Sequence, residues 1–266
     1  MIHYSMPSEE YHAHPAVSRS QLEDFARSPW YFQRMHRDPA RPPRTESPSQ
    51  LVGNLAHCAT FEPGEFFARY TIGPDVNKNT KAWKEFVEQA GGKQVISQDQ
   101  YYAAHAMAQS MRNVPSIKDL FASGSGEVSI FATDADTGLE LRCRVDWLHK
   151  VDDRRVIVVD GKTMGGVTID EMAAQIGRMK YHLQQAFYTR VMRQAGLEVL
   201  GFVFVGVETS WPYMANAAVL DDDTDTSARA TVDKLLRQFA QCQATDKWPP
   251  IGEEMGLISI KPWFLE

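Results

Sequence analysis

The chain has 266 residues, of which 43% are apolar and 23% are charged, and its net charge is −6. This balance supports a sizeable hydrophobic core and excludes disordered, collagen-like and low-complexity classes. Charges interrupt every apolar stretch before it reaches the roughly 18 residues of a membrane span, and the first residues lack the regions of a signal peptide. The cysteines Cys58, Cys143 and Cys242 show no C-x-x-C spacing, which argues against a disulfide framework or a cysteine-ligated metal. We therefore expect a soluble, cytoplasmic protein without a membrane partner.

The sign of the charge varies along the chain. Residues 27–44 carry a local charge of +4 and residues 142–162 one of +2, whereas the run from Asp221 to Asp225 is strongly acidic. Each cluster taken alone is typical of a solvated face. An acidic protein is at a disadvantage in binding nucleic acid through its bulk charge. A locally positive cleft is still compatible with this composition, because nearby charges dominate the potential in a cleft.

The front half of the chain shows helical patterns. Ser18 and Gln21 have the spacing of a capping box, and the apolar residues that follow, up to Tyr31, predict a helix that ends at the prolines of a stiff, basic loop. Residues 50–61 predict a short helix. Two more helices are expected near 79–90 and 98–113, separated by Gly91 and Gly92.

The pattern then changes to strands. Apolar residues alternate with polar ones over 128–133 and 139–145, with a hairpin turn at 136–138, and 156–159 reads as a strand buried on both faces. A helix near 179–195, strands near 199–207 and 214–220 and a last helix near 224–242 complete the chain. We expect one α/β domain over 1–266, with a helical part to about 120, a mixed sheet core over about 121–220, and the C-terminal helix.

The strongest chemical signal lies on two neighbouring strands. The pattern predicts that Asp146 and Asp160 each close a strand, so adjacent pairing would bring their carboxylates together, and Lys162 projects from the same face as Asp160. Two carboxylates and a lysine suit phosphodiester hydrolysis, with Mg²⁺ on the carboxylates and the lysine beside the attacking water. A D-x-K pattern is short and common, and two surface aspartates beside a solvated lysine would show it too.

Further polar residues could join this site. His57 follows the small residues Gly53 and Ala56, which would let another element approach, although a lone helical histidine is more often structural. Glu127 either adds a carboxylate near the metal or is a solvated acid at a strand end. One helical stripe either packs on the sheet or faces a nucleic-acid backbone, and it consists of Tyr181, Gln184 and Tyr188.

These motifs together resemble the PD-(D/E)XK nuclease superfamily, in particular its RecB-like branch. They occur in the order G-x-x-x-H (53–57), Glu127, R-x-R-x-D (142–146), D-x-K-T (160–163) and Q-x-x-x-Y (184–188). Several blocks, including those at 11–22, 53–66, 182–188 and 248–249, resemble the nuclease domain of the RecE-type exonucleases. Gly161 departs from the bulkier apolar residue usual there, and the spacing from 146 to 160 is long, which we interpret as an extended hairpin turn.

The resemblance implies a restriction-endonuclease-like core. It also implies that His57, Asp146 and Asp160 ligate the metal and that Lys162 is catalytic. The helical stripe, Arg142 and Arg144 would position the DNA strand. The implied activity is a Mg²⁺-dependent exonuclease on double-stranded DNA ends, for which Mn²⁺ is expected to substitute. It would degrade 5′ to 3′ and leave 3′ tails for a RecT-like annealing protein.

The expected assembly is a ring of identical subunits, a tetramer or alternatively a trimer, in the cytoplasm of a bacterium or encoded by a phage. The basic segments 27–44 and 142–162 would face its channel. The alternatives are another nuclease of the superfamily, such as an endonuclease or one of different polarity, and an inactive DNA-binding scaffold on the same fold.

Overall fold

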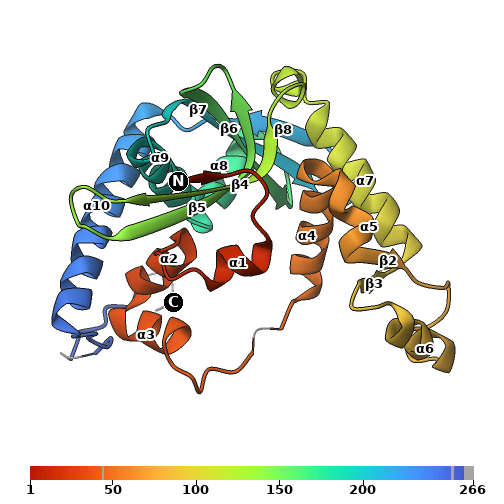
Figure 1. Ribbon diagram of the computed structural model, residues 1–266, viewed down its shortest axis with the longest axis horizontal. Coiled ribbons are helices and arrows are strands. Elements are labelled where there is room, and N and C mark those ends of the chain that lie inside the picture. Colours follow the sequence, from red (N-terminus) through yellow and green to blue (C-terminus); the bar gives the residue numbers. More distant parts are fainter. Residues whose placement is uncertain (44, 253–254, 261–266) are drawn as a thin grey trace.

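The computed structural model describes residues 1–43, 45–252 and 255–260. Its centre is a six-stranded sheet with the order β1-β4-β5-β6-β7-β8 (Figure 1). β6 and β7 run parallel, and the other neighbours are antiparallel. The strands are β1 (Ile2–His3), β4 (Ser125–Thr133), β5 (Glu140–Lys150), β6 (Arg155–Met164), β7 (Glu198–Glu208) and β8 (Ala215–Ala218). The predicted mixed sheet flanked by helices is confirmed.

Helices surround this sheet. They are α1 (Ser8–Ala13), α2 (Arg19–Arg27), α3 (Pro29–His36), α4 (Pro48–Phe61), α5 (Phe66–Arg69), α6 (Lys81–Gln89), α7 (Gln98–Arg112), α8 (Ile169–Arg178), α9 (Tyr181–Gln194) and α10 (Asp222–Thr245), with 3₁₀ turns at Pro63–Glu65 and Lys118–Phe121. None of the helices in the described ranges has the length and apolar character that crossing a bilayer requires.

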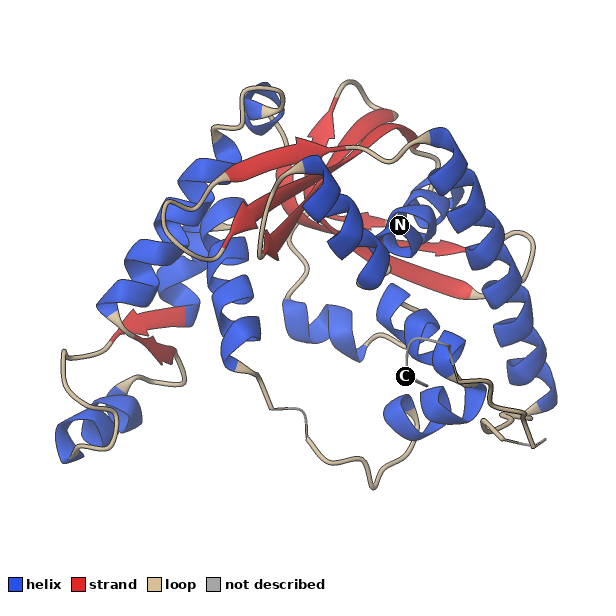
Figure 2. Cartoon of the chain, turned by 180° about the vertical axis from the view of Figure 1, so that it is seen from behind, coloured by secondary structure: helices blue, strands red, loops and turns tan. Residues whose placement is uncertain are grey.

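A small parallel sheet, which the sequence patterns did not predict, lies apart from the main one. It pairs β2 (Tyr70–Ile72) with β3 (Gln94–Ile96), and α6 extends beyond it as an arm (Figure 2). Each strand has three residues, which is too short for an alternating pattern to stand out in the sequence.

Local signals explain where the front helices begin. The capping box at Ser18 is present, because its hydroxyl accepts from the Gln21 backbone N–H and Gln21 Oε1 accepts from the Ser18 N–H at 2.8 Å. The prediction of a single helix that includes Tyr31 is wrong, because the first helix ends before Ser28 and a second one begins after it. Ser28 caps α3 through the Tyr31 N–H, and Pro29 occupies the first turn, where a proline costs no hydrogen bond.

The expected hairpin between β4 and β5 is confirmed. The two strands pair up to Thr133 and Glu140, and Gly138 adopts a φ of +69° in the turn. The long spacing from 146 to 160 has a different cause from the one expected. β5 and β6 both continue beyond the expected strands, and only residues 151–154 form the turn between them.

The two faces of the sheet are covered differently. α9 packs on one face, with α10 and α2 beyond it, and the largest core cluster lies there. α4 and α7 cover β6, β7 and β8 on the opposite face through a second cluster that contains Phe61, Met111 and Val205. On β4, Phe131 packs instead against the N-terminal segment, with Tyr11 and Ala16. The candidate site lies on β4 and β5, with the N-terminal segment on one side and His57 of α4 on the other.

Candidate active site

β5 and β6 separate in the middle of the sheet. Their pairing ends at Trp147 and Val159, although β5 continues beside β4 and β6 continues beside β7. Asp146 and Asp160 are the next residues on the two strands. They therefore lie in mid-strand rather than at strand ends, which corrects the sequence expectation. The separation opens the sheet, and the Gly161 N–H, free of a ladder partner on β5, donates to Asp146 Oδ2 at 2.9 Å.

Asp160 and Lys162 project from the same face of β6, as predicted, and they form an ion pair. Gln184 Nε2 of α9 donates to Asp160 Oδ1, so both carboxylate oxygens have partners, and Asp160 is only 1% exposed. The Lys162 ammonium also lies 4.7 Å from the centre of the Tyr181 ring. Two residues of the helical stripe thus hold the Asp160–Lys162 pair, one through its amide and the other through its ring.

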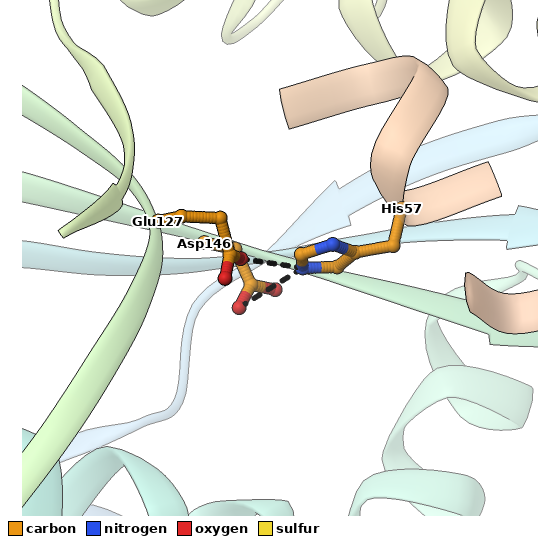
Figure 3. A group of neighbouring side chains, drawn as sticks. All are labelled: His57, Glu127 and Asp146. Carbon is orange, nitrogen blue, oxygen red and sulfur yellow. Dashed lines mark ion pairs between the residues drawn. The ribbon is translucent and has the colours of Figure 1, made fainter. Parts of the chain in front are cut away.

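A second group of side chains meets beside this pair. His57 of α4 points at the carboxylates of Glu127 and Asp146 (Figure 3), and its Nε2 lies 3.2 Å from Asp146 Oδ1 and 3.4 Å from Glu127 Oε1. One ligand atom from each of the three residues lies within 4.8 Å of the others. Glu127 and Asp146 stand opposite each other on β4 and β5, between the paired residues 126–147 and 128–145. We call His57, Glu127 and Asp146 the metal-ligand cluster, because each offers an atom that could hold a metal ion.

The metal-ligand cluster fits a divalent cation. Mg²⁺ holds ligands at about 2.1 Å in an octahedron, so neighbouring donors lie about 3 Å apart. The two contacts of His57 Nε2 are close to that spacing. Two carboxylates suit Mg²⁺ and Mn²⁺, whereas an imidazole is a ligand more typical of transition metals. Asp160 lies outside this cluster in the structure, so its ligation of a metal stays a prediction.

Burial and mutual charge set the protonation of the cluster. Burial raises the pKa of Glu127 to about 7, with a further rise from Asp146 and opposing effects from His57 and Arg144. Burial would lower the pKa of His57, but the Asp146 contact and the Glu127 charge raise it to about 9. The charge of His57 holds the pKa of Asp146 below its usual value although burial opposes this. The two carboxylates thus favour the charged form of His57, and a bound cation would replace its proton.

A cleft of about 660 Å³ opens beside Glu127 and Asp146. Its other lining comes from the N-terminal helices, β5, α9 and the loop after α3, and includes Tyr11, His12, Ser18, Arg19, Ser20, His36, Arg41, Arg142, Arg144 and Tyr188. Positively charged side chains are therefore concentrated in this cleft although the protein as a whole is acidic. Arg41 belongs to the basic segment 27–44, whereas Arg44 of that segment lies outside the described residues.

The predicted DNA-contacting side chains already have partners within the chain. Gln184 donates to Asp160, Arg144 pairs with Glu127, and Arg142 donates to the backbone carbonyl of Tyr11. Burial raises the pKa of Tyr188 well above its usual value, so its hydroxyl stays protonated beside the cleft. DNA contact by these residues, and by Tyr181, remains a prediction.

Two residues that shape the site were not predicted for it. Tyr11 lies over the guanidinium groups of Arg142 and Arg144, and Phe61 packs against His57 with ring centroids 4.8 Å apart. Phe61 follows His57 by four residues, so helical spacing places both on one face of α4. That spacing is a usable signal for Phe61. Helical spacing does not identify Tyr11 as a site residue, because the two arginines that it covers lie more than 130 residues away.

The fold and the arrangement of Asp146, Asp160 and Lys162 define a protein of the PD-(D/E)XK nuclease superfamily. The chain belongs to the family described as "PDDEXK-like domain of unknown function (DUF3799)", whose model matches residues 18–259. The narrower resemblance to the RecE-type exonucleases stays a prediction.

Comparison with solved structures supports the fold. A crystal structure from Eubacterium rectale described as "Putative exonuclease" has a TM-score of 0.62, with 14% identity over 98% of both chains. A structure described as SSO0001 has a TM-score of only 0.27, with 11% identity over 88% of both chains, which is too low to indicate a shared fold. No curated protein matches the sequence significantly.

Proposed function

We propose that this protein is a Mg²⁺-dependent exonuclease that degrades one strand of double-stranded DNA from linear ends, 5′ to 3′. The observation that carries the nuclease proposal is the metal-ligand cluster beside the buried Asp160–Lys162 pair. Such a site suits the hydrolysis of a phosphodiester, because a cation and a lysine together offset the charge that builds on the phosphoryl oxygens. The exonuclease mode and the polarity rest on the resemblance to the RecE type.

The chain's own residues divide this work. His57, Glu127 and Asp146 would hold the cation, which supplies Lewis acidity and an activated water when bound. Asp160, fixed by Gln184, keeps the Lys162 ammonium at the gap between β5 and β6. Lys162 would orient the attacking water and stabilise charge on the phosphate oxygens. Tyr181 limits the directions in which that ammonium can move, since its ring lies beside it.

The cleft would accommodate a DNA strand. It extends from the metal-ligand cluster to Arg19 and Arg41, whose positive charges would bind the phosphate groups. The remaining single strand would pass to a RecT-like annealing protein. A closed ring of subunits, of which four is the favoured number and three the alternative, would keep an acidic protein on its DNA.

The test is a digest of linear duplex DNA labelled at one end, with Mg²⁺, with Mn²⁺, and with EDTA. We expect metal-dependent release of nucleotides, with the 5′ label released first and a covalently closed circle left intact. Cleavage of the circle would instead show an endonuclease, and early release of the 3′ label would show the opposite polarity. Duplex binding without cleavage in either metal would show an inactive scaffold.

A further inference from the structure

Two arginines on β5 face the N-terminal segment. Arg142 is 4% exposed and donates to the backbone carbonyl oxygens of Tyr11 and His12, the latter at 3.3 Å. Arg144 donates through Nη2 to the carbonyl oxygen of Met6. The Tyr11 ring centre lies 4.9 Å from the Arg142 guanidinium carbon and 5.2 Å from that of Arg144. Residues 6–12 are therefore fastened to β5 by both arginines.

Arg144 has a second role that Arg142 lacks. Its Nε lies 3.0 Å from Glu127 Oε2 and also donates to the Glu127 carbonyl oxygen at 3.3 Å. The other carboxylate oxygen, Oε1, faces His57 Nε2 at 3.4 Å. The Glu127 carboxylate is thus held between Arg144 on one side and the remaining members of the metal-ligand cluster on the other.

The backbone of Glu127 makes this support necessary. Its φ is +52°, in the left-handed region that a residue with a long side chain rarely adopts. Such a conformation persists only where neighbouring contacts fix it. Arg144 supplies these contacts, because it grips both the carboxylate and the carbonyl oxygen of the same residue.

We propose that Arg144 is a positioning residue that fixes the Glu127 carboxylate for a divalent cation. This inference concerns cation binding and deepens the proposed function without requiring that DNA is cleaved. Groups that orient a metal ligand typically change metal affinity or activity 10- to 100-fold when they are removed.

The rival role for Arg144 is a direct contact with a DNA phosphate, as the sequence suggests. The two roles have different signatures. Loss of a phosphate contact weakens DNA binding and lowers the salt dependence of that binding by about one unit of slope. Loss of a positioning contact weakens cation binding in the absence of DNA, and it lowers kcat more than it raises KM.

Arg144→Met is tested against the matched control Arg142→Met, and Mn²⁺ binding to each DNA-free protein is measured by calorimetry. We expect about a tenfold or greater weakening of Mn²⁺ binding for Arg144→Met, and less than about a twofold change for Arg142→Met. Arg144→Lys should lie between them, because an ammonium can pair with Glu127 but cannot reproduce the planar fork. Both methionine variants should lower the Tm, since both lose hydrogen bonds to the N-terminal segment.

Equal Mn²⁺ affinities for the two methionine variants would overturn the proposal. So would unchanged Mn²⁺ binding by Arg144→Met together with weaker duplex binding and a smaller salt slope. If Arg144→Met does not fold, Arg144→Lys and wild type provide the comparison. If the Mn²⁺ affinities of the variants follow the expected order but the wild-type protein cleaves no DNA, the proposed function is refuted and this inference still stands.

Discussion

The Phe61 ring stands where a side chain at position 161 would stand. A Cβ atom on Gly161 would lie 2.5 Å from Phe61 Cε2 and 2.7 Å from Cζ, well inside contact distance. Phe61 belongs to α4, the helix that also carries His57, and Gly161 lies on β6 between Asp160 and Lys162. The missing side chain therefore sets how closely the helix with the histidine approaches the strand with the lysine.

Gly161→Ala should destabilise the protein by about 1–3 kcal/mol, because a well-packed aromatic ring must move. Phe61→Leu in the same chain should recover part of this loss, with a coupling free energy of about 1 kcal/mol or more between the two sites. Denaturant titrations of the two single variants and the double variant give this quantity. Gly165→Ala is the control, since a Cβ there meets nothing within 4 Å. Strict additivity would contradict the packing relationship.

Asp146→Asn and Asp160→Asn should each reduce cleavage at least about a hundredfold, since the metal site supplies several kcal/mol of barrier lowering. Asp146→Asn removes a charge from the metal-ligand cluster, whereas Asp160→Asn removes the counter-charge of Lys162. Initial rates on end-labelled duplex in Mg²⁺ measure both. Ca²⁺ should support DNA binding by the wild type with little cleavage, because its geometry is larger and looser. A near-normal rate for either variant would remove that residue from the site.

Lys162→Ala should abolish cleavage while DNA binding stays measurable, because the lysine acts in the transition state and other cations hold the phosphates. Fluorescence anisotropy in Ca²⁺ gives the affinity, and single-turnover digestion in Mg²⁺ gives the rate. Lys84→Ala on the distant α6 is the control for the loss of one positive charge. If affinity and rate fall by the same factor, Lys162 is only an electrostatic contact.

Asp134→Asn should destabilise the protein by about 2–4 kcal/mol at pH 7, because it leaves Arg190 without its buried partner. Asp134 is fully buried and lies 2.6 Å from Arg190 Nε, whereas Asp136, 2.6 Å from Nη2, is largely exposed. Asp136→Asn should therefore change stability by less than about 1 kcal/mol. Urea titrations of the three proteins make the comparison.

The contribution of Asp134 should also depend on pH. Hydrogen bonds from Arg190 and Thr137 lower the pKa of Asp134 below its ordinary 3.8, although burial opposes this. A carboxyl with a lowered folded-state pKa stabilises the protein above its unfolded pKa, and this stabilisation is lost as the pH falls through the folded value. The gap between wild type and Asp134→Asn should therefore narrow below about pH 4. A gap of the same size at pH 3 and pH 7 would show that the charge of Asp134 is unimportant.

The active protein should be a closed ring that stays on its DNA. An acidic chain should release DNA often, and a ring would prevent this by enclosing the duplex. Light scattering should give the mass of about four subunits, or of three, and digestion should continue after excess unlabelled DNA is added. A monomeric mass, or digestion that stops on addition of the competitor, would exclude the ring.

Much of this fold follows from short-range patterns in the sequence. The Ser18 capping box, the hairpin around Gly138 and the D-x-K geometry of Asp160 and Lys162 depend on neighbours within a few residues, and all three were predicted correctly. The starts of α3 and α8 also carry local signals, namely Ser28 before a proline and Thr168 three residues before Glu171. Local hydrogen bonds fix such features whatever the rest of the chain does.

The remainder depends on contacts between distant segments. The separation of β5 from β6 decides that Asp146 and Asp160 lie in mid-strand beside the gap, and no periodicity encodes where two strands stop pairing. The sequence motif predicts that Arg144 contacts DNA. In the fold, its side chain instead pairs with Glu127 and donates to the carbonyl oxygen of Met6, 138 residues away. The sequence determined which residues could form a metal-dependent site. Only the tertiary structure decided which of them meet, because burial and pairing across the sheet select partners that sequence distance conceals.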